Sequence, residues 1–468
     1  MISLKHLLNC ADILQPLQDI NLNQQLNFIT DSRKYNHPAA FVAIPGAKVN
    51  PLNLITPILD QGCPLVIYQK NLENDELIQK LSLRFPTSKF LPVSDSVTFL
   101  QQLTNSHIQE WKTADPHHTV FAISGSNGKT THKEMLSHIL KTIRPNKIVA
   151  TEKNNNNHLG VPLTLLNVHE QTEMVVLELG SNHPGEIKVL CDIAVPNAGL
   201  TTNIGATHLE FFGTEEKVFT EEGYLYYAVK NQLKDKGFYL INLDDPFLST
   251  LPLFPGAITY GENPKAMARV TFLENGAEIN YKGESLRVIN DSITGRHNKL
   301  NLVTCAFIAH QFYPSEKDSI IQAALKFRPT KNRSEWIEFE KTPVYLDAYN
   351  ANPSSMKAAL EGFKNAVLEK NMSLDEACVV LGDMNELGES TQRYHQEIGQ
   401  FVQALGFKNA FFIGRFSSFY LQGHSEGQGR ASAALFKQEY RTEMLKKFRI
   451  HFIKGSRSLQ LESLFDIS

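Results

Sequence analysis

The residues best suited to chemistry stand in one short run, Ser124-Gly-Ser-Asn-Gly-Lys-Thr-Thr131. Gly125 and Gly128 let the backbone curl so that its N–H groups point at phosphate oxygens. Lys129 can reach the terminal phosphates of a nucleotide, and the Thr130 hydroxyl can hold Mg²⁺. Only the short form GxxGKT is present, because an isoleucine stands where the longer motif has its first glycine. We predict an ATP-binding loop of these residues: Gly125, Ser126, Asn127, Gly128, Lys129, Thr130 and Thr131.

The elements on either side of this run are those that position a phosphate loop. An apolar strand, Val120–Ile123, leads in, and a helical pattern with apolar residues on one face leads out as far as Ile143. The N-terminus of such a helix adds positive charge beside bound phosphate. Glycine-rich turns also arise by chance, but the strand before and the helix after favour nucleotide binding.

The length of 468 residues suggests three domains, because domains usually have about 100–200 residues. Polar, proline-containing segments near 113–118 and 326–331 predict domains of residues 1–112, 113–327 and 328–468. Helical and strand-like patterns alternate through the second and third domains, which is typical of mainly parallel α/β sheets covered by helices. The predicted strands include Ala40–Ile44, Leu65–Tyr68, Met174–Leu179, Val344–Leu346, Cys378–Leu381, Ala410–Ile413 and Ile450–Ile453.

Composition excludes several classes of partner. The formal net charge is -3, so we expect no nucleic-acid-binding surface. No stretch of about 18 apolar residues exists, and the first residues lack the apolar core of a signal peptide, so we expect no membrane span. The five cysteines are dispersed without metal-binding spacing, which suits a reducing cytoplasm.

Further segments, in order along the chain, resemble those of one family. They are Asp31-Ser-Arg33, Phe41-Val-Ala-Ile-Pro-Gly46, Thr151 to Leu166, Glu178-Leu-Gly-Ser-Asn-His-Pro-Gly-Glu-Ile187, Asn203 to Gly213 with His208-Leu-Glu210, Gly295-Arg-His-Asn-Lys-Leu-Asn301, Asp347-Ala-Tyr-Asn-Ala-Asn-Pro353, Leu381-Gly-Asp-Met384 with Glu386-Leu-Gly388, and Lys454-Gly-Ser-Arg457. With the short phosphate loop, they resemble the Mur ligase superfamily, and within it the branch that adds D-alanyl-D-alanine. Lys153 stands where that family usually has glycine.

The resemblance implies a fold of three α/β domains: an N-terminal UDP-sugar-binding domain, a central P-loop ATPase domain and a C-terminal Rossmann-like domain. It implies a cytoplasmic, monomeric ligase that uses ATP and two Mg²⁺ ions. ATP would phosphorylate the terminal carboxylate of UDP-MurNAc-tripeptide, and the amine of D-Ala-D-Ala would attack the acyl phosphate. The third residue of the tripeptide, meso-diaminopimelate or L-lysine, stays open.

The resemblance also implies roles for single residues. The implied catalytic residues are Lys129, His208, Glu222 and Asn154, and the implied metal ligands are Thr130, Glu178, His208 and Glu222. Besides the phosphate loop, the implied ATP-binding residues are Asn298, Asn301, Arg333 and Asp347. The implied substrate-binding residues are Ser32, Arg33, Asn156, Asn157, His183, Tyr349, Asn350 and Asn352.

Structural roles compete with these assignments. Glu178 could be a hydrogen-bonded residue at a strand end, and Asn298 could cap a helix. Asn-rich segments are often solvated turns, and Arg333 lies in a basic run. Asn350 and Asn352 could form a polar turn before a helix that begins at a proline.

Glu222 is the sharpest departure from the family pattern. In the family, a lysine 14 residues after the magnesium-binding histidine forms a carbamate that helps to hold the second Mg²⁺. Counting from His208 gives Glu222. We predict that Glu222 supplies an unmodified carboxylate, with a bridging water to make up its shorter reach. Glu221 is an alternative ligand, and a solvated acidic helix face is the structural alternative.

Three other functions compete. The chain could be a superfamily ligase with another substrate, similar to folyl-polyglutamate synthase, but Asp31-Ser-Arg33 counts against this. It could be a P-loop NTPase that drives motion, but then the third domain is unexplained. A non-catalytic scaffold that binds nucleotide or UDP-sugar stays open, because the expected lysine is absent.

Overall fold

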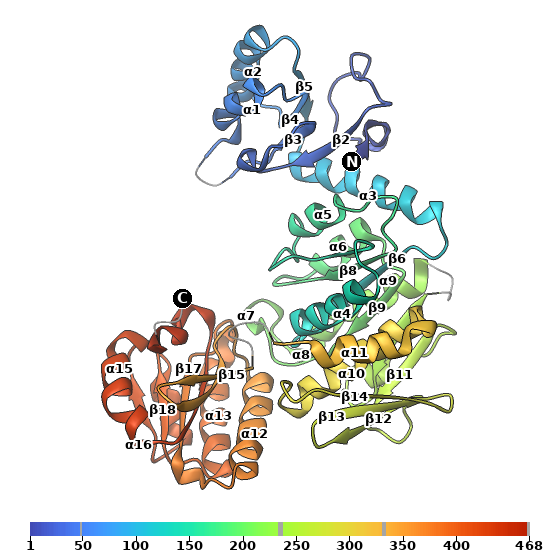
Figure 1. Cartoon of the computed structure of the whole chain (residues 1–468). Helices are drawn as coiled ribbons and strands as arrows, with labels where there is room; N and C mark the ends of the chain where they lie inside the picture. Colours follow the sequence, from blue (N-terminus) through green and yellow to red (C-terminus); the bar gives the residue numbers. More distant parts are fainter. Residues whose placement is uncertain (47–48, 233–236, 330–333, 466–468) are drawn as a thin grey trace.

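The computed structural model describes residues 1–46, 49–232, 237–329 and 334–465. It contains three α/β sheets, which follow one another along the chain (Figure 1). The first sheet has five strands, the second nine and the third six. The chain is therefore built from three α/β domains, as the sequence predicted.

The first domain has the strand order β1-β2-β3-β4-β5. Only β1 and β2 pair antiparallel, and the other neighbours are parallel. Its strands are β1 (Ile2–Ser3), β2 (Gln25–Ile29), β3 (Ala39–Ala43), β4 (Leu65–Gln69) and β5 (Lys89–Val93). Its helices are α1 (Thr56–Asp60), α2 (Leu72–Arg84) and α3 (Ser96–Ala114).

Helix α3 joins the first domain to the second. Its N-terminal half contributes Phe99, Leu100 and Leu103 to the core of the first sheet. Its C-terminal half contributes Ile108 and Trp111 to the core of the second sheet. Figure 1 shows this helix running between the two domains. Because the boundary expected at 112/113 falls in the last turn of α3, it stays a prediction, as does the boundary at 327/328.

The second domain has the strand order β14-β13-β12-β11-β10-β9-β6-β8-β7. Its strands are β6 (Thr119–Ser124), β7 (Ile148–Ala150), β8 (Met174–Glu178), β9 (Ala198–Thr201), β10 (Phe238–Asn242), β11 (Ala257–Gly261), β12 (Ala268–Leu273), β13 (Gly276–Tyr281) and β14 (Glu284–Ile289). Its helices are α4 (Lys129–Ile143), α5 (Gly160–Leu165), α6 (Glu186–Ala194), α7 (Leu209–Phe212), α8 (Glu215–Glu222), α9 (Tyr224–Gln232), α10 (Arg296–Phe312) and α11 (Lys317–Lys326).

One part of this sheet differs from the expected alternation of helix and strand. Strands β12, β13 and β14 follow one another as an antiparallel meander at the sheet edge. Every neighbouring pair from β7 through to β12 in this order is parallel, and the phosphate-loop strand β6 lies between β8 and β9. Parallel strands end at the same sheet edge, so the loops after β6, β8 and β9 meet there.

The third domain has the order β15-β16-β20-β17-β18-β19, with only the β15–β16 pair antiparallel. Its strands are β15 (Glu335–Phe339), β16 (Thr342–Asp347), β17 (Ala377–Gly382), β18 (Ala410–Ile413), β19 (Gln428–Arg430) and β20 (Ile450–Lys454). Its helices are α12 (Pro353–Glu369), α13 (Thr391–Leu405), α14 (Ser417–Gly423), α15 (Ala433–Glu439) and α16 (Leu445–Lys447).

The strands expected from sequence are present in all three domains, shifted by one or two residues at some ends. All five cysteines are buried free thiols. None of the helices in the described ranges combines the length and apolar character that crossing a bilayer requires.

Candidate active site

The phosphate loop lies between β6 and α4, as its sequence predicted. Two glycines give it its shape. Gly125 has a φ of 120°, and a Cβ there would stand 2.2 Å from the Thr202 hydroxyl. Gly128 has a φ of 80° and caps the N-terminus of α4. A side chain would be strained at either position, so the loop needs glycine at both.

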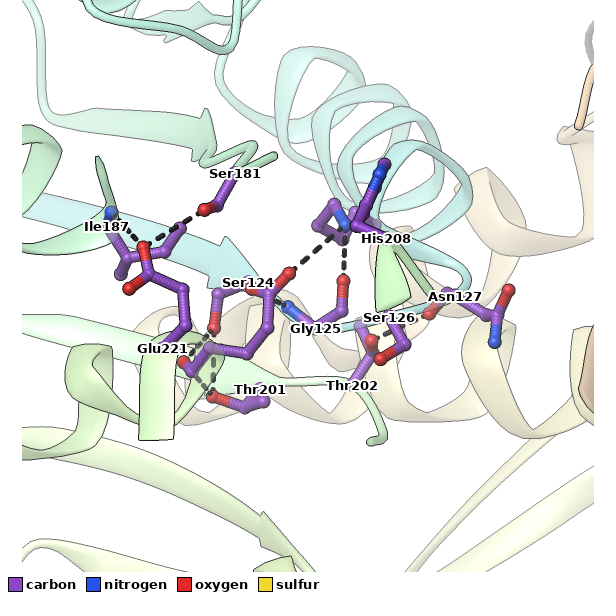
Figure 2. A network of polar contacts seen from close by, with 12 residues as sticks. Ser124, Gly125, Ser126, Asn127, Ser181, Ile187, Thr201, Thr202, His208 and Glu221 are labelled. Carbon is purple, nitrogen blue, oxygen red and sulfur yellow. Dashed lines mark hydrogen bonds and ion pairs between the residues drawn. The ribbon is translucent and has the colours of Figure 1, made fainter. Parts of the chain in front are cut away.

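The segment that follows β9 braces this loop. The Ser126 N–H donates to the Asn203 carbonyl at 2.8 Å, and the Asn127 N–H donates to Asn203 Oδ1 at 3.2 Å. The Gly205 N–H donates to Ser126 Oγ at 2.9 Å. The Thr202 hydroxyl donates to the Asn127 carbonyl at 2.6 Å, a contact that Figure 2 shows. These contacts hold the loop in shape.

Lys129 is turned back onto its own loop. Its ammonium group donates to the Gly125 carbonyl and lies 3.6 Å from Glu222 Oε1. The other carboxylate oxygen of Glu222 accepts the Gly125 N–H at 2.7 Å. The Glu222 side chain is only 2% exposed. A buried carboxylate thus balances the charge of the phosphate-loop lysine.

Glu221, the preceding residue, faces a different segment. Its carboxylate accepts from Ser181 Oγ at 3.0 Å, from the Gly185 N–H at 2.6 Å and from the Ile187 N–H at 2.7 Å. The last two groups lie at the N-terminus of α6, where a negative charge is stabilised. These contacts give Glu221 a structural role, so they do not favour it as the alternative metal ligand.

Glu178, at the end of β8, lies beside the phosphate loop. Its Oε1 accepts from Thr130 Oγ1 and from Asn156 Nδ2, both at 3.0 Å. Its Oε2 is buried and has no hydrogen-bond partner among the described residues. A buried, unpaired carboxylate oxygen is costly unless a cation or another donor reaches it. Hydrogen bonding at the end of the strand therefore accounts for Glu178 Oε1 but not for Oε2.

His208 connects the second domain to the third. Its Nδ1 lies 2.5 Å from Glu386 Oε2, and its side chain is 16% exposed. The close contact with the His208 ring lowers the pKa of the Glu386 carboxyl, although burial acts in the opposite direction. Beside this pair, the Glu210 N–H donates to the Glu386 carbonyl at 3.0 Å. Leu209 and Leu387 also belong to one continuous hydrophobic cluster.

The third domain also contacts the phosphate loop. Asn352 Nδ2 donates to Asn127 Oδ1 at 2.7 Å, and Asn127 Nδ2 donates to Ser354 Oγ at 2.9 Å. Asn352 caps α12, which begins at Pro353. Its backbone therefore has the structural role considered from sequence, a polar turn before a helix. Its side chain serves the cap and the domain contact.

Lys454, at the end of β20, organises the neighbouring strand end. Its ammonium group donates to Asp347 Oδ2 at 2.6 Å and to the Asn350 carbonyl at 2.9 Å. The lysine side chain is 2% exposed and that of Asp347 is 15% exposed. This ion pair holds the segment from Asp347 to Asn350 against the sheet.

These elements enclose a cavity of about 780 Å³ between the second and third domains. Most of the residues assigned from sequence line it. They are Ser126, Asn127, Gly128, Lys129, Thr130, Thr131, Asn154, Asn156, Asn157, Glu178, His183, His208, Asn298, Asn301, Asp347, Tyr349 and Asn350. The volume lies in the range of ligand-binding pockets.

Other assigned residues do not line this cavity. Gly125, Glu222 and Asn352 lie behind its wall, in the contacts given above. Ser32 and Arg33 belong to the first domain, where Arg33 Nη2 pairs with Asp31 Oδ2 at 2.9 Å and its side chain is 87% exposed. Arg333 lies outside the described residues.

The polar turn after β7 holds its residues differently. Asn157 Oδ1 accepts from the Leu159 and Gly160 N–H groups, at 3.1 and 2.9 Å, so it shapes the start of α5. Asn154 is exposed, whereas Asn156 contacts Glu178 as described above. Lys153 has a φ of 50°, the left-handed conformation that favours glycine, which explains the glycine of the family pattern.

The remaining assigned asparagines lie at the start of α10. Asn298 Nδ2 donates to the Thr294 carbonyl at 3.1 Å, and the helix cap itself is Gly295. Asn301 lies so near the phosphate loop that a Cβ at Gly128 would stand 3.4 Å from its amide nitrogen. The first two turns of α10 therefore lie directly beside the phosphate loop.

The structure adds Lys454, Glu386, Asn203 and Ser354 to the residues that build the site. The sequence contained a signal for three of them, because Lys454 and Glu386 belong to motifs of the third domain and Asn203 to a motif of the second. Among the described residues, no three His, Cys, Asp or Glu side chains come together as a metal site of their own. A cation here would need phosphate or water oxygens as well.

Two families of known domains match the chain. Residues 123–309 match the Mur ligase middle domain, and residues 332–443 match the Mur ligase, glutamate ligase domain. The chain is also similar to UDP-N-acetylmuramoyl-tripeptide–D-alanyl-D-alanine ligases. The enzyme of Bacillus subtilis is 29% identical over 93% of this chain and 91% of its own length. The enzyme of Haemophilus influenzae is 31% identical over 84% of this chain and 81% of its own length.

Solved structures agree in fold. MurF from Acinetobacter baumannii has a TM-score of 0.78 at 24% identity, with 99% of this chain and 97% of that chain covered. MurF ligase from Thermotoga maritima in complex with ADP has a TM-score of 0.75 at 23% identity, with 94% and 96% covered. From the two domain matches, and from the likeness to the Haemophilus influenzae enzyme over most of both chains, we conclude that this chain belongs to the Mur ligase family.

Proposed function

We propose that the protein ligates D-alanyl-D-alanine to a UDP-N-acetylmuramoyl-tripeptide in a reaction driven by ATP hydrolysis to ADP and phosphate. The observation that carries this proposal is the cavity between the second and third domains. One wall presents a phosphate loop, a carboxylate and a histidine, and the other presents the Asp347–Asn350 segment. The similar enzymes of Bacillus subtilis and Haemophilus influenzae bear the name of this reaction.

The first chemical task is to bring two anions together. The tripeptide carboxylate must attack the γ-phosphate of ATP, and both groups are negatively charged. Lys129 would leave the Gly125 carbonyl and pair with the phosphates, since its present partner is only a carbonyl and a carboxylate 3.6 Å away. The N–H groups at the start of α4 point to the same place and favour negative charge there.

Mg²⁺ fits the residues beside the loop. The Thr130 hydroxyl and the Glu178 carboxylate are hard oxygen donors, and Glu178 Oε2 is buried without a partner among the described residues. His208 lines the same cavity and would serve a second ion. When bound, Mg²⁺ would neutralise the phosphate charge as the acyl phosphate forms.

Glu222 has a role that its contacts support directly. Its carboxylate accepts the Gly125 N–H and balances the charge of Lys129, and both contacts support the shape of the loop. Its predicted part in holding the second Mg²⁺ stays a prediction. It would need an intervening water, since Glu222 does not line the cavity.

The substrates divide between the walls of the cavity. Asn298 and Asn301 of α10 would contact the nucleotide, with Asp347 held by Lys454 for the ribose. Asn154, Asn156, Asn157 and His183 would surround the tripeptide carboxylate, and Tyr349 and Asn350 would contact D-Ala-D-Ala. Ser32 and Arg33 would bind the UDP-sugar in the first domain. Arg333 stays a predicted partner of the γ-phosphate.

The free, buried cysteines support a cytoplasmic location, and we expect a monomer.

One assay tests the proposal. The full chain is incubated with ATP, Mg²⁺ and UDP-MurNAc-tripeptide, with and without D-Ala-D-Ala, and phosphate release and ligated product are measured. Both the meso-diaminopimelate and the L-lysine tripeptide are used. We expect phosphate release that depends on both substrates. Release without either substrate would indicate a simple NTPase, and nucleotide binding without release would indicate a scaffold.

A further inference from the structure

We infer that Glu386 is a positioning residue that orients His208 for a cation, so that docking of the third domain completes the cation site. The inference rests on the proposed function, which gives His208 its cation. Glu386 belongs to the third domain and His208 to the second, and their side chains meet at 2.5 Å. The pair therefore connects the chemistry to the arrangement of the two domains.

The geometry assigns the two ring nitrogens. Nδ1 lies 2.5 Å from Glu386 Oε2, an ion-pair contact whose angle does not meet hydrogen-bond geometry, and a proton on Nδ1 makes this contact attractive. This leaves Nε2 as the nitrogen that can bind a cation. A carboxylate behind a metal-binding histidine commonly fixes both the tautomer and the ring orientation.

The backbone around the pair is built for close approach. His208 has a φ of 50° and Glu386 a φ of 62°, so both residues hold the left-handed conformation. Gly388 has a φ of 54°, and a Cβ there would stand 3.0 Å from the Glu210 Cα. The hydrogen bond from the Glu210 N–H to the Glu386 carbonyl sets the register of the two segments. Such strained positions persist only where the surrounding contacts hold them.

The test measures binding of Mn²⁺, as a spectroscopic probe for Mg²⁺, to the full chain with a non-hydrolysable ATP analogue. Electron paramagnetic resonance gives the number of bound ions and the affinity of each. We expect Glu386→Ala to weaken the second ion about tenfold, the lower end of the effect of such partners, because Glu386 is 45% exposed. Glu386→Gln should lose about threefold or less, since its amide oxygen still accepts the Nδ1 proton.

A matched control and a double variant separate positioning from other roles. Glu389 is exposed and three residues away, so Glu389→Ala should leave both affinities unchanged. If Glu386 acts through His208, adding Glu386→Ala to His208→Ala should cost nothing further. Additive losses would make Glu386 a direct ligand and overturn the inference, as would an unchanged affinity in Glu386→Ala.

The same measurement separates this inference from the proposed function. Wild-type protein that binds only one ion with the nucleotide would overturn both the second cation of the proposed function and this inference. Wild-type protein that binds two ions, with Glu386 variants that match it, would overturn this inference alone. If Glu386→Ala fails to fold, the milder Glu386→Gln and its combination with His208→Ala decide the question.

Discussion

The phosphate loop and the Asp31–Arg33 segment are both expected to bind phosphate-containing ligands, yet they are built in opposite ways. The phosphate loop is braced by buried partners, and Glu222 behind it is 2% exposed. The Arg33 side chain is 87% exposed. Among the described residues, its ion-pair partner is Asp31, two residues earlier in the chain. The first region is held in shape by contacts with other segments of the protein, whereas the second has only a local ion pair. A preorganised charge in a site that excludes water contributes strongly to catalysis, whereas an exposed charge contributes little because solvent screens it.

Removing the lysine of the organised region should have the largest effect. Lys129→Ala should lower the ligase rate about 100-fold or more, because a donor fixed near the transition-state charge is lost. Melting should show a folded protein. Lys141 lies exposed on the same helix, so Lys141→Ala is the matched control and should keep the wild-type rate. A Lys129→Ala rate above a tenth of wild type would contradict the role assigned to the loop.

Glu222 tests whether the bracing carboxylate matters to turnover. Glu222→Ala should lower the rate about 30-fold, since the Gly125 N–H and Lys129 lose their partner. Wild-type activity in CO₂-depleted buffer should not respond to bicarbonate. Glu216→Ala, on the exposed face of α8, serves as control. A bicarbonate-stimulated wild type would point to a carbamylated lysine elsewhere, and a fully active Glu222→Ala would remove Glu222 from the site.

A variant of Glu221 tests whether a buried carboxylate also holds the N-terminus of α6 in place. In Glu221→Gln an N–H donor would face the Gly185 or Ile187 N–H, so a hydrogen bond to a charged acceptor is lost. We expect the local free energy of opening to fall by about 2 kcal/mol. Hydrogen exchange at the Gly185 and Ile187 amides measures it, with the amides of β13 as an internal reference. Equal protection in both proteins would show that Glu221 does not hold α6.

Arg33 should show the smallest effect. Arg33→Ala should weaken binding of the UDP-muramoyl substrate about fivefold and leave ATP binding unchanged, because an exposed arginine contributes one screened contact. Isothermal titration of both ligands measures this, with Lys34→Ala as the adjacent exposed control. If Arg33→Ala lowered the affinities for ATP and for the UDP-muramoyl substrate equally, the phosphate loop and the Asp31–Arg33 segment would not be independent binding regions.

Local patterns allowed prediction of the phosphate loop, its flanking elements and most strands, because these depend on residues close in sequence. Lys454 was noted only as part of a motif. Its partner Asp347 lies opposite it on the adjacent strand, and the order of β16 and β20 cannot be deduced from local periodicity. Glu386 was missed as a partner of His208 for the same reason, since their contact depends on how two domains dock.

The antiparallel meander could have been found from sequence. Strands β12 and β14 alternate buried and exposed residues, as in Ala268–Leu273, which is the period of a strand with one solvated face. The position of Glu222 behind the loop could not have been found. Whether a carboxylate at the end of a helix faces the cavity or the loop backbone depends on how α8 packs, which local sequence patterns do not give.

Helix α3 carries a consequence for substrate selection. Its 19 residues make a rod about 28 Å long with one half in each of two cores, so the first two domains should move as a single body. Under the proposed function, the anchor for the sugar nucleotide and the phosphate loop then stand a fixed distance apart. The enzyme would then select its substrate by length, because a shorter muramoyl peptide anchored in the first domain could not bring its carboxylate to the phosphate.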